Sequence, residues 1–104
     1  MPKNTHDVIV VGAGHNGLTA ASYMAKAGLD VVVLEKNDWI GGAAVSRELY
    51  PGWKYSNCSY VCSLLRPEIM RDLELYKYGL QIIPYEGSAT MNDDEKWRLL
   101  HSLP

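Results

Sequence analysis

Apolar residues form two short runs near the start of the chain, separated by an alanine-rich stretch. The run DVIVVGAG, residues 7–14, ends in glycine and predicts a strand buried on both faces. The stretch HNGLTAASYMAKAG, residues 15–28, predicts a helix that stops at Gly28. LDVVVLEK, residues 29–36, predicts a second buried strand. Together these segments predict one βαβ unit over residues 6–36, with a right-handed crossover.

The pattern weakens in the middle of the chain. Residues 37–61 carry several glycine and proline breaks, which predict mostly loop with short turns. RPEIMRDLELYKYG, residues 66–79, predicts a second helix, because Pro67 suits a first turn and Gly79 an end. Its apolar stripe would consist of Ile69, Leu73 and Tyr76.

The last quarter of the chain is less regular. Residues 80–87 are a strand candidate, in which Pro84 indicates an edge or a strand end. The tail, residues 91–104, is polar and then apolar, with no clear partner. The expected organisation is a βαβ core over 6–36, a loop and helix over 37–79, and a strand and tail over 80–104.

Composition and charge exclude several functions. The 104 residues are 47% hydrophobic and 21% charged, which is typical of a soluble globular domain. A net charge of -2 with scattered basic residues predicts no basic patch that would bind nucleic acid. No apolar stretch approaches the roughly 18 residues of a membrane-spanning helix, and the start MPKNTHD does not resemble a secretory signal. We therefore expect a cytoplasmic location, with peripheral membrane association left open.

Two cysteines, Cys58 and Cys62, stand four residues apart. This spacing differs from the C-x-x-C of redox motifs and zinc knuckles. On a helix the two would share one face, but ordinary buried thiols of a reducing compartment are the favoured interpretation. The sequence predicts no metal site.

The glycines that end the first strand have the spacing G-x-G-x-x-G. Gly12 allows a sharp turn, Gly14 allows the backbone to approach a pyrophosphate, and Gly17 allows the helix to lie close to the sheet. The helix N-terminus adds unpaired N–H groups and the positive end of its dipole. Small residues continue along one helical face at Ala21, Ala25 and Gly28. This pattern predicts a dinucleotide-binding unit.

An acidic residue ends the second strand. Glu35 stands 18 residues after Gly17, where a carboxylate accepts hydrogen bonds from ribose hydroxyls. Its negative charge disfavours a 2′-phosphate on that ribose. Lys36 follows directly and is consistent with a solvated strand end.

A second small-residue loop helps to choose between FAD and NAD. It consists of Gly41, Gly42, Ala43 and Ala44. FAD extends past the helix terminus and needs such a loop to let it pass, whereas NAD recognition does not, so the loop favours FAD. The alternative is a plain surface turn, because Gly-Gly is a common turn dipeptide.

These residues resemble a known family. The segment from DVIVVGAGHNGL to SLLRPEI, within a match over residues 6–87, resembles the N-terminus of the phytoene-desaturase-like FAD-dependent oxidoreductases. The His15-Asn16 pair and the stretch from Gly41 to Pro67 are specific to one branch. The resemblance implies an α/β fold: a Rossmann-like FAD/NAD(P)-binding βαβ unit in an incomplete doubly wound parallel sheet. Residues 1–104 would be the N-terminal portion of that domain, so we expect a fragment of a longer enzyme.

The resemblance also implies roles for particular residues. Those against the FAD pyrophosphate would be Gly12, Ala13, Gly14, His15, Asn16 and Gly17. Glu35 would bind the adenosine ribose, with Lys36 beside it, and the middle of the cofactor would lie near Gly42, Ala43 and Ala44. Many carotenoid desaturases carry a basic residue directly after the Gly-Gly pair, so Ala43 is a departure that weakens the case for a carotene substrate.

No catalytic residue is assigned. His15 invites an acid/base role, but a residue at a helix start presents its backbone N–H to phosphate, so we expect binding instead. Disulfide-reducing flavoproteins need a thiol pair soon after the Gly-Gly loop. Cys58 and Cys62 lie 16 and 20 residues beyond Gly42, a spacing that does not match.

Two functions remain open. The first is an FAD-binding N-terminal fragment of an oxidoreductase that transfers a hydride from a substrate C–H bond to flavin, with a small apolar or lipid-like substrate in the full-length enzyme. We expect the fragment alone to be inactive or poorly active. The second is a non-catalytic NAD-binding regulatory or sensor module. A structural domain without a ligand is a third interpretation. The first strand is expected to lack a neighbour on one side.

Overall fold

Six strands, two α-helices and two short 3-10 helices make up the part of the chain that the computed structural model describes, residues 5–84, 87–91 and 97–101. In chain order they are β1 (Val8–Val11), α1 (His15–Lys26), β2 (Val31–Leu34), η1 (Gly42–Ala44), β3 (Ser46–Tyr50), β4 (Trp53–Ser56), α2 (Pro67–Asp72), η2 (Leu75–Tyr78), β5 (Gly87–Met91) and β6 (Trp97–His101). Parts of the strand predicted over 80–87 and of the tail predicted over 91–104 lie outside the described residues.

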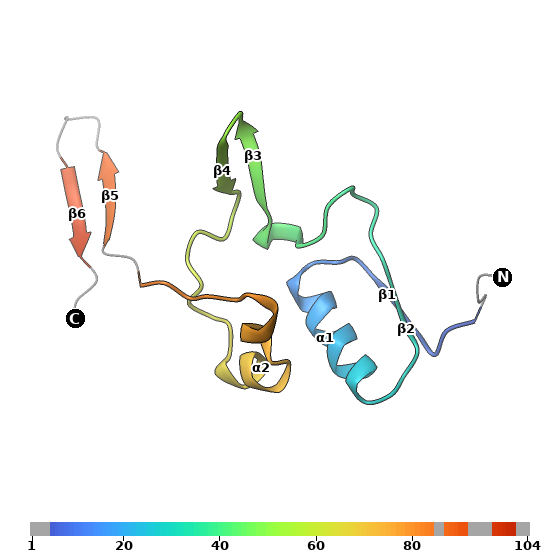
Figure 1. The fold of residues 1–104 in the computed structure, drawn as a ribbon. Coiled ribbons are helices and arrows are strands. Elements are labelled where there is room, and N and C mark those ends of the chain that lie inside the picture. The colour runs from blue at the N-terminus through green and yellow to red at the C-terminus, as the bar shows by residue number, and fades with distance from the viewer. Residues whose placement is uncertain (1–4, 85–86, 92–96, 102–104) are drawn as a thin grey trace.

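The first three elements form the predicted βαβ unit. β1 and β2 pair in parallel, with Val8 opposite Val31 at one end. α1 runs alongside the two strands (Figure 1), and its Ala21 is buried. The helix ends at Lys26, and Gly28 follows with a φ of 93°, a left-handed conformation that favours glycine. This part of the prediction is confirmed.

β1 is covered on one face only. Its residues alternate between partly covered and exposed, and Ile9 and Val11 are 60% and 84% exposed. The prediction of burial on both faces is therefore wrong for this strand, because α1 accounts for one face and no described element covers the other. Among the described strands, β1 pairs with β2 alone, along one of its edges.

A β-hairpin occupies part of the segment predicted as loop. β3 pairs antiparallel with β4, with Ser46 opposite Ser56. Pro51 and Gly52 connect the two strands, and Gly52 has a φ of 81°, typical of the second central residue of a type II turn. The loop prediction is wrong here because this Pro-Gly pair reverses the chain between two strands instead of ending regular structure.

The second predicted helix is interrupted. Pro67 occupies the first turn of α2 as predicted, but Glu74 has a φ of 51°, which breaks the helix. The chain continues as the 3-10 helix η2 and ends at Gly79, whose φ is 94°. Met70 is the buried residue of α2, whereas Tyr76 of the predicted apolar stripe is exposed. A single helix over this stretch is therefore wrong.

The last two strands form a second hairpin. β5 and β6 pair antiparallel, with Gly87 opposite His101. Residues 80–84 lie in no strand, so the strand predicted from residue 80 is wrong over this part and β5 begins at Gly87. The expectation that the tail has no partner is also wrong, since β6 pairs with β5.

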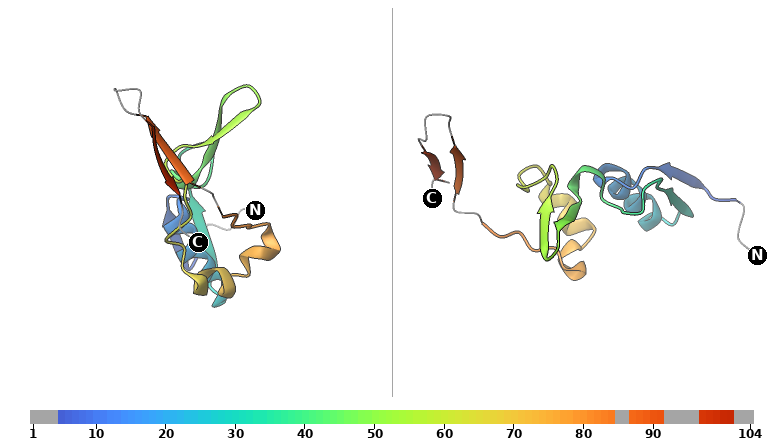
Figure 2. Two further views of the ribbon diagram at one scale, coloured as in Figure 1. Left: turned by 90° about the vertical axis from the view of Figure 1, so that its left-hand side faces the viewer. Right: turned by 90° about the horizontal axis from the view of Figure 1, so that it is seen from above.

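The elements are arranged in an elongated row. The strands form three separate two-stranded sheets, and Figure 2 shows the β5–β6 hairpin apart from the βαβ unit. The radius of gyration is 18.3 Å, whereas a compact domain of this length has about 13 Å. Within the described residues, the buried apolar side chains are Ala13, Ala21 and Met70. The fold is thus the predicted incomplete α/β unit, of Rossmann-like βαβ topology, with little core of its own.

The two cysteines lie on the surface. Cys58 and Cys62 are free and exposed, so their expected burial is wrong; their segment is irregular chain between β4 and α2. None of the helices in the described ranges has the length and apolar character that a membrane crossing requires. Nor do these ranges bring together three side chains of the metal-binding types.

Candidate functional site

The predicted phosphate loop connects the end of β1 to the start of α1. Gly12 has a φ of 98°, and its N–H donates a hydrogen bond of 2.7 Å to the carbonyl oxygen of Leu34, next to β1 in the sheet. Ala13 follows and is 1% exposed. The chain therefore leaves the strand through a left-handed turn that favours glycine.

Gly17 brings the helix against the strand end. A Cβ at this position would lie 2.5 Å from the carbonyl oxygen of Gly12 and 3.4 Å from Cγ1 of Val10. The shorter distance is well inside van der Waals contact, so any side chain here would force α1 away from β1. The close approach that the glycine spacing predicts is thus present in the structure.

The N-terminus of α1 offers unsatisfied backbone donors. Gly14 is the N-cap in an extended conformation, and no described side chain caps the helix. The first turn contains no acidic residue, and His15 and Asn16 at its start are exposed. Such a terminus attracts anions, because its first N–H groups lack intrahelical acceptors and the helix dipole is positive there.

Glu35 lies directly after β2 and reaches back to the loop. Its Oε2 accepts a hydrogen bond of 2.8 Å from the N–H of Ala13. Its Oε1 accepts bonds from the backbone N–H and the side-chain Nδ2 of Asn37, at 2.9 and 2.8 Å. The bond from Ala13, followed by those from Asn37, lowers the pKa of Glu35 below its ordinary value. The side chain is therefore a carboxylate at neutral pH, with its charge beside the glycine loop.

The flanking residues differ in what they contribute. Lys36 is exposed, as expected for a solvated strand end. Asn37 was not predicted to belong to the site. The signal that could have found it is its type, since asparagine after a strand end readily bonds to nearby groups in a turn.

The second glycine pair packs directly on the first loop. The N–H of Gly41 donates a 2.8 Å hydrogen bond to the carbonyl oxygen of Ala13, and Gly41 forms a β-bridge with Gly14. A Cβ on Gly42 would lie 2.9 Å from the Cα of Gly14. Gly41 and Gly42 have φ angles of 125° and 58°. The two loops therefore form one unit, in which residues far apart in the sequence touch through bare backbone.

Small residues continue after this contact. Ala43 and Ala44 lie in η1 and are exposed, beside the start of α1 in Figure 1. The structure thus brings all the predicted binding residues to the edge of the sheet where β1 and β2 end. They are Gly12, Ala13, Gly14, His15, Asn16, Gly17, Glu35, Lys36, Gly42, Ala43 and Ala44.

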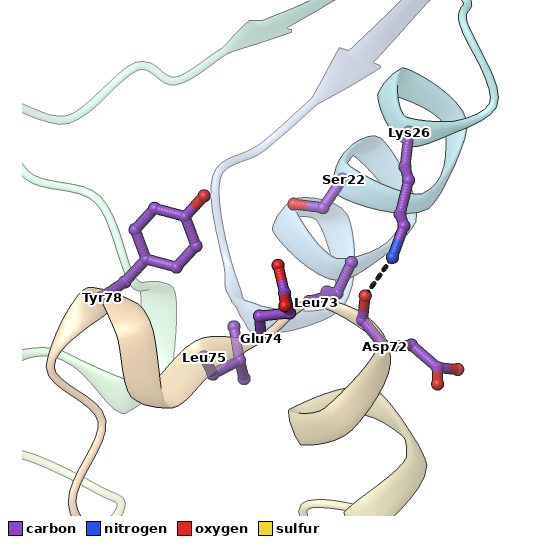
Figure 3. A pocket seen from close by; sticks show the side chains of 7 residues that line it. All are labelled: Ser22, Lys26, Asp72, Leu73, Glu74, Leu75 and Tyr78. Carbon is purple, nitrogen blue, oxygen red and sulfur yellow. Dashed lines mark hydrogen bonds between the residues drawn. The ribbon is translucent and has the colours of Figure 1, made fainter.

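A separate cleft of about 480 Å³ lies along the second half of α1. Figure 3 shows its lining, which comes from α1 and from residues 72–78. Lys26 donates a hydrogen bond to the backbone carbonyl of Asp72, and the hydroxyl of Tyr23 donates one of 3.0 Å to the Asp72 carboxylate. The cleft marks the contact between α1 and the segment after α2. It lies away from the glycine loops, which are at the opposite end of the helix.

The family assignment agrees with this geometry. A family model described as an NAD(P)-binding Rossmann-like domain matches residues 10–76. The chain belongs to this family. Its members are dinucleotide-binding domains, and the matched range contains both glycine loops and Glu35. The Rossmann-like domain also includes the β3–β4 hairpin and most of the interrupted second helix.

Three relatives extend the comparison. Pyridine nucleotide-disulfide oxidoreductase domain-containing protein 2 of Mus musculus is 46% identical over 104 residues, covering 97% of this chain and 18% of that protein. Phytoene desaturase of Neurospora crassa is 41% identical over 102 residues, covering 98% and 15%. A limonene dehydrogenase subunit of Castellaniella defragrans is 37% identical over 86 residues, covering 82% and 16%.

These relatives confirm the resemblance to the phytoene-desaturase-like oxidoreductases. The Mus musculus protein represents the branch indicated by the His15-Asn16 pair and the stretch from Gly41 to Pro67. The chain spans less than a fifth of the length of each of the three. The matched part covers between 82% and 98% of this chain.

Proposed function

We propose that this chain binds FAD as the N-terminal portion of an oxidoreductase. In this proposal, the loop Gly12–Gly17 and the uncapped start of α1 hold the pyrophosphate, and Glu35 accepts hydrogen bonds from the adenosine ribose. Gly42, Ala43 and Ala44 lie along the middle of the cofactor. The bare backbone at positions 14 and 42 and the ionised carboxylate of Glu35 fit these roles.

The observation that carries the choice of FAD is the contact between the two glycine loops. The Gly41–Ala13 hydrogen bond and the Gly42–Gly14 approach put a second small-residue loop beside the phosphate loop. A ligand that continues past the helix terminus would run along this second loop. FAD continues in this way, and recognition of NAD requires no such loop, so the arrangement favours FAD.

The proposed reaction is the transfer of a hydride from a substrate C–H bond. The bound flavin would accept the hydride, and the residues of this chain would bind and orient the cofactor. The names of the relatives support redox chemistry, since they include a desaturase, a dehydrogenase and an oxidoreductase. Phytoene and limonene are both hydrocarbons, so we propose a small apolar or lipid-like substrate for the full-length protein.

A thermal-shift experiment with two ligands tests the choice of cofactor. FAD at a hundredfold excess over its Kd should raise the melting temperature of the full chain by roughly 10 °C. NADH at the same concentration should raise it by much less. A larger shift with NADH would instead support an NAD-binding regulatory or sensor module. A colourless protein whose melting temperature responds to neither ligand would contradict both functions.

A further inference from the structure

Three hydrogen bonds of normal length reach the Glu35 carboxylate, and Asn37 supplies two of them; the backbone of Lys36 adds a weaker interaction. The backbone N–H and the side-chain Nδ2 of Asn37 both donate to Oε1, while the third bond comes from Ala13 to Oε2. Asn37 belongs to neither glycine loop and lies outside the G-x-G-x-x-G pattern. Its side chain is exposed, so burial does not account for its position.

The arrangement of these bonds leaves little freedom to the carboxylate. Each carboxylate oxygen can accept about two hydrogen bonds. The two donors of Asn37 therefore fill Oε1, whereas Oε2 keeps one acceptor position beside the bond from Ala13. Rotation of the carboxylate would break all three bonds together. The remaining acceptor position is thus fixed on the oxygen that already contacts the glycine loop.

We propose that Asn37 is a positioning residue that turns the Glu35 carboxylate so that the free acceptor position of Oε2 faces a ribose hydroxyl of the bound cofactor. This inference rests on the proposed function and names a further residue of that same site. Asn37 acts through Glu35 and does not itself contact the ligand. A purely structural role in the turn after β2 would affect stability without changing how binding depends on the ionisation of Glu35.

The pH dependence of FAD binding separates these two roles. Both oxygens of Glu35 face N–H donors, so protonation would remove the negative charge and put a competing donor on one of them. Affinity should therefore fall as the pH drops through the pKa of Glu35. Because Asn37 is one of the groups that lower this pKa, Asn37→Ala should raise it. In the variant, the loss of affinity should therefore begin at a higher pH than in the wild type.

The experiment is a titration of the full chain with FAD, followed by flavin fluorescence, from about pH 8 to about pH 4. At neutral pH, Asn37→Ala should bind FAD about three- to tenfold more weakly, the range for one lost hydrogen bond to a charged group in a partly exposed site. Asn37→Ser keeps a side-chain donor and should recover part of the loss. Asn57→Ala removes an exposed asparagine side chain outside the site and should match the wild type at every pH.

A double-mutant cycle with Glu35→Gln tests whether Asn37 acts through the carboxylate. Glu35→Gln should weaken binding and remove its acid dependence, and Asn37→Ala should then add little. Two results would overturn the inference while leaving FAD binding intact. One is an Asn37→Ala variant with wild-type affinity and pH profile. The other is an Asn37→Ala variant whose affinity for FAD is lowered by the same factor at all pH values, both in the wild-type protein and in Glu35→Gln. A wild-type chain that does not bind FAD would overturn the proposed function and this inference together.

Discussion

The βαβ unit and the two hairpins differ in the range of the contacts that hold them. In the βαβ unit, β1 pairs with a strand from beyond the helix, and Glu35 bonds to an amide 22 residues earlier. In the hairpins, β3 pairs with β4 and β5 with β6, their neighbours along the chain. Every residue of β3 is exposed. A local change should therefore have distant effects in the first region and stay local in the second.

The largest expected effect comes from a methyl group at the strand–helix contact. Gly17→Ala puts a Cβ 2.5 Å from the carbonyl oxygen of Gly12, so α1 must move off β1. We expect a loss of about 3 kcal/mol in the free energy of unfolding, at the upper end for overpacking. This exceeds the ~1 kcal/mol that alanine gains over glycine within a helix. Urea unfolding measures the first effect, and loss of FAD binding should accompany it.

Gly52→Ala is the matched change in the β3–β4 hairpin. Its φ of 81° makes alanine strained, but a Cβ there meets nothing within 4 Å. The cost should be about 1–2 kcal/mol in the local stability of the hairpin, with FAD affinity unchanged. Equal effects of the two variants on FAD binding would refute the proposed difference between the regions.

A smaller effect is expected at the contact between the two glycine loops. In Gly42→Ala the new Cβ would lie 2.9 Å from the Cα of Gly14, so the second loop must retreat from the first. We expect FAD binding about tenfold weaker, with a loss of stability near 1 kcal/mol. Gly79→Ala is the control, because its φ of 94° is also left-handed but its surroundings are open. Unchanged FAD affinity in Gly42→Ala would show that the loops need not touch.

The smallest effect should come from the contact between the βαβ unit and α2, where Tyr23 of α1 donates a hydrogen bond to Asp72. This bond, followed by Arg71, lowers the pKa of Asp72 below its ordinary value of 3.8. A carboxyl group with a lowered pKa stabilises the fold above its ordinary pKa, and the contribution disappears as the pH falls through the folded value.

Tyr23→Phe should therefore lower the melting temperature slightly at neutral pH. The difference in melting temperature between the variant and the wild type should shrink as the pH falls below the ordinary pKa of Asp72. Thermal melts at several pH values measure this. The control is Tyr60→Phe, which loses the hydroxyl of a tyrosine that is 85% exposed and should have no effect. A Tyr23→Phe difference that stays constant with pH would exclude the Asp72 carboxylate as the partner that matters.

The range of the contacts also separates what the sequence could predict from what it could not. The βαβ unit was predictable because three strong signals in the sequence agree. They are an apolar strand, glycines at fixed spacing and an acidic residue after the second strand. These signals describe one geometry that only small residues permit, as the 2.5 Å distance at Gly17 illustrates. The contact between Gly41 and Ala13 was not predictable, because it depends on the path of the intervening loop.

The errors concentrate where local preference does not decide the structure. Leu73 and Glu74 are good helix formers, yet Glu74 adopts a left-handed conformation and ends α2, which no pattern in the sequence indicates. Pro51-Gly52 was interpreted as a break, although the same pair forms a tight turn when the flanking residues can pair. β1 was expected to be buried on both faces, but burial depends on what packs against a strand, not on its composition.

The bare backbone contact between positions 14 and 42 limits how this site can change in evolution. When two side chains touch, enlarging one can be offset by shrinking the other. Here a Cβ on Gly42 would meet the Cα of Gly14, and Gly14 has no side chain that could be made smaller. A mutation to any larger residue at position 42 therefore has no compensating substitution at position 14, and it must be absorbed by movement of the main chain. We expect glycine to be retained at position 42 even in homologues whose surrounding loop differs in sequence.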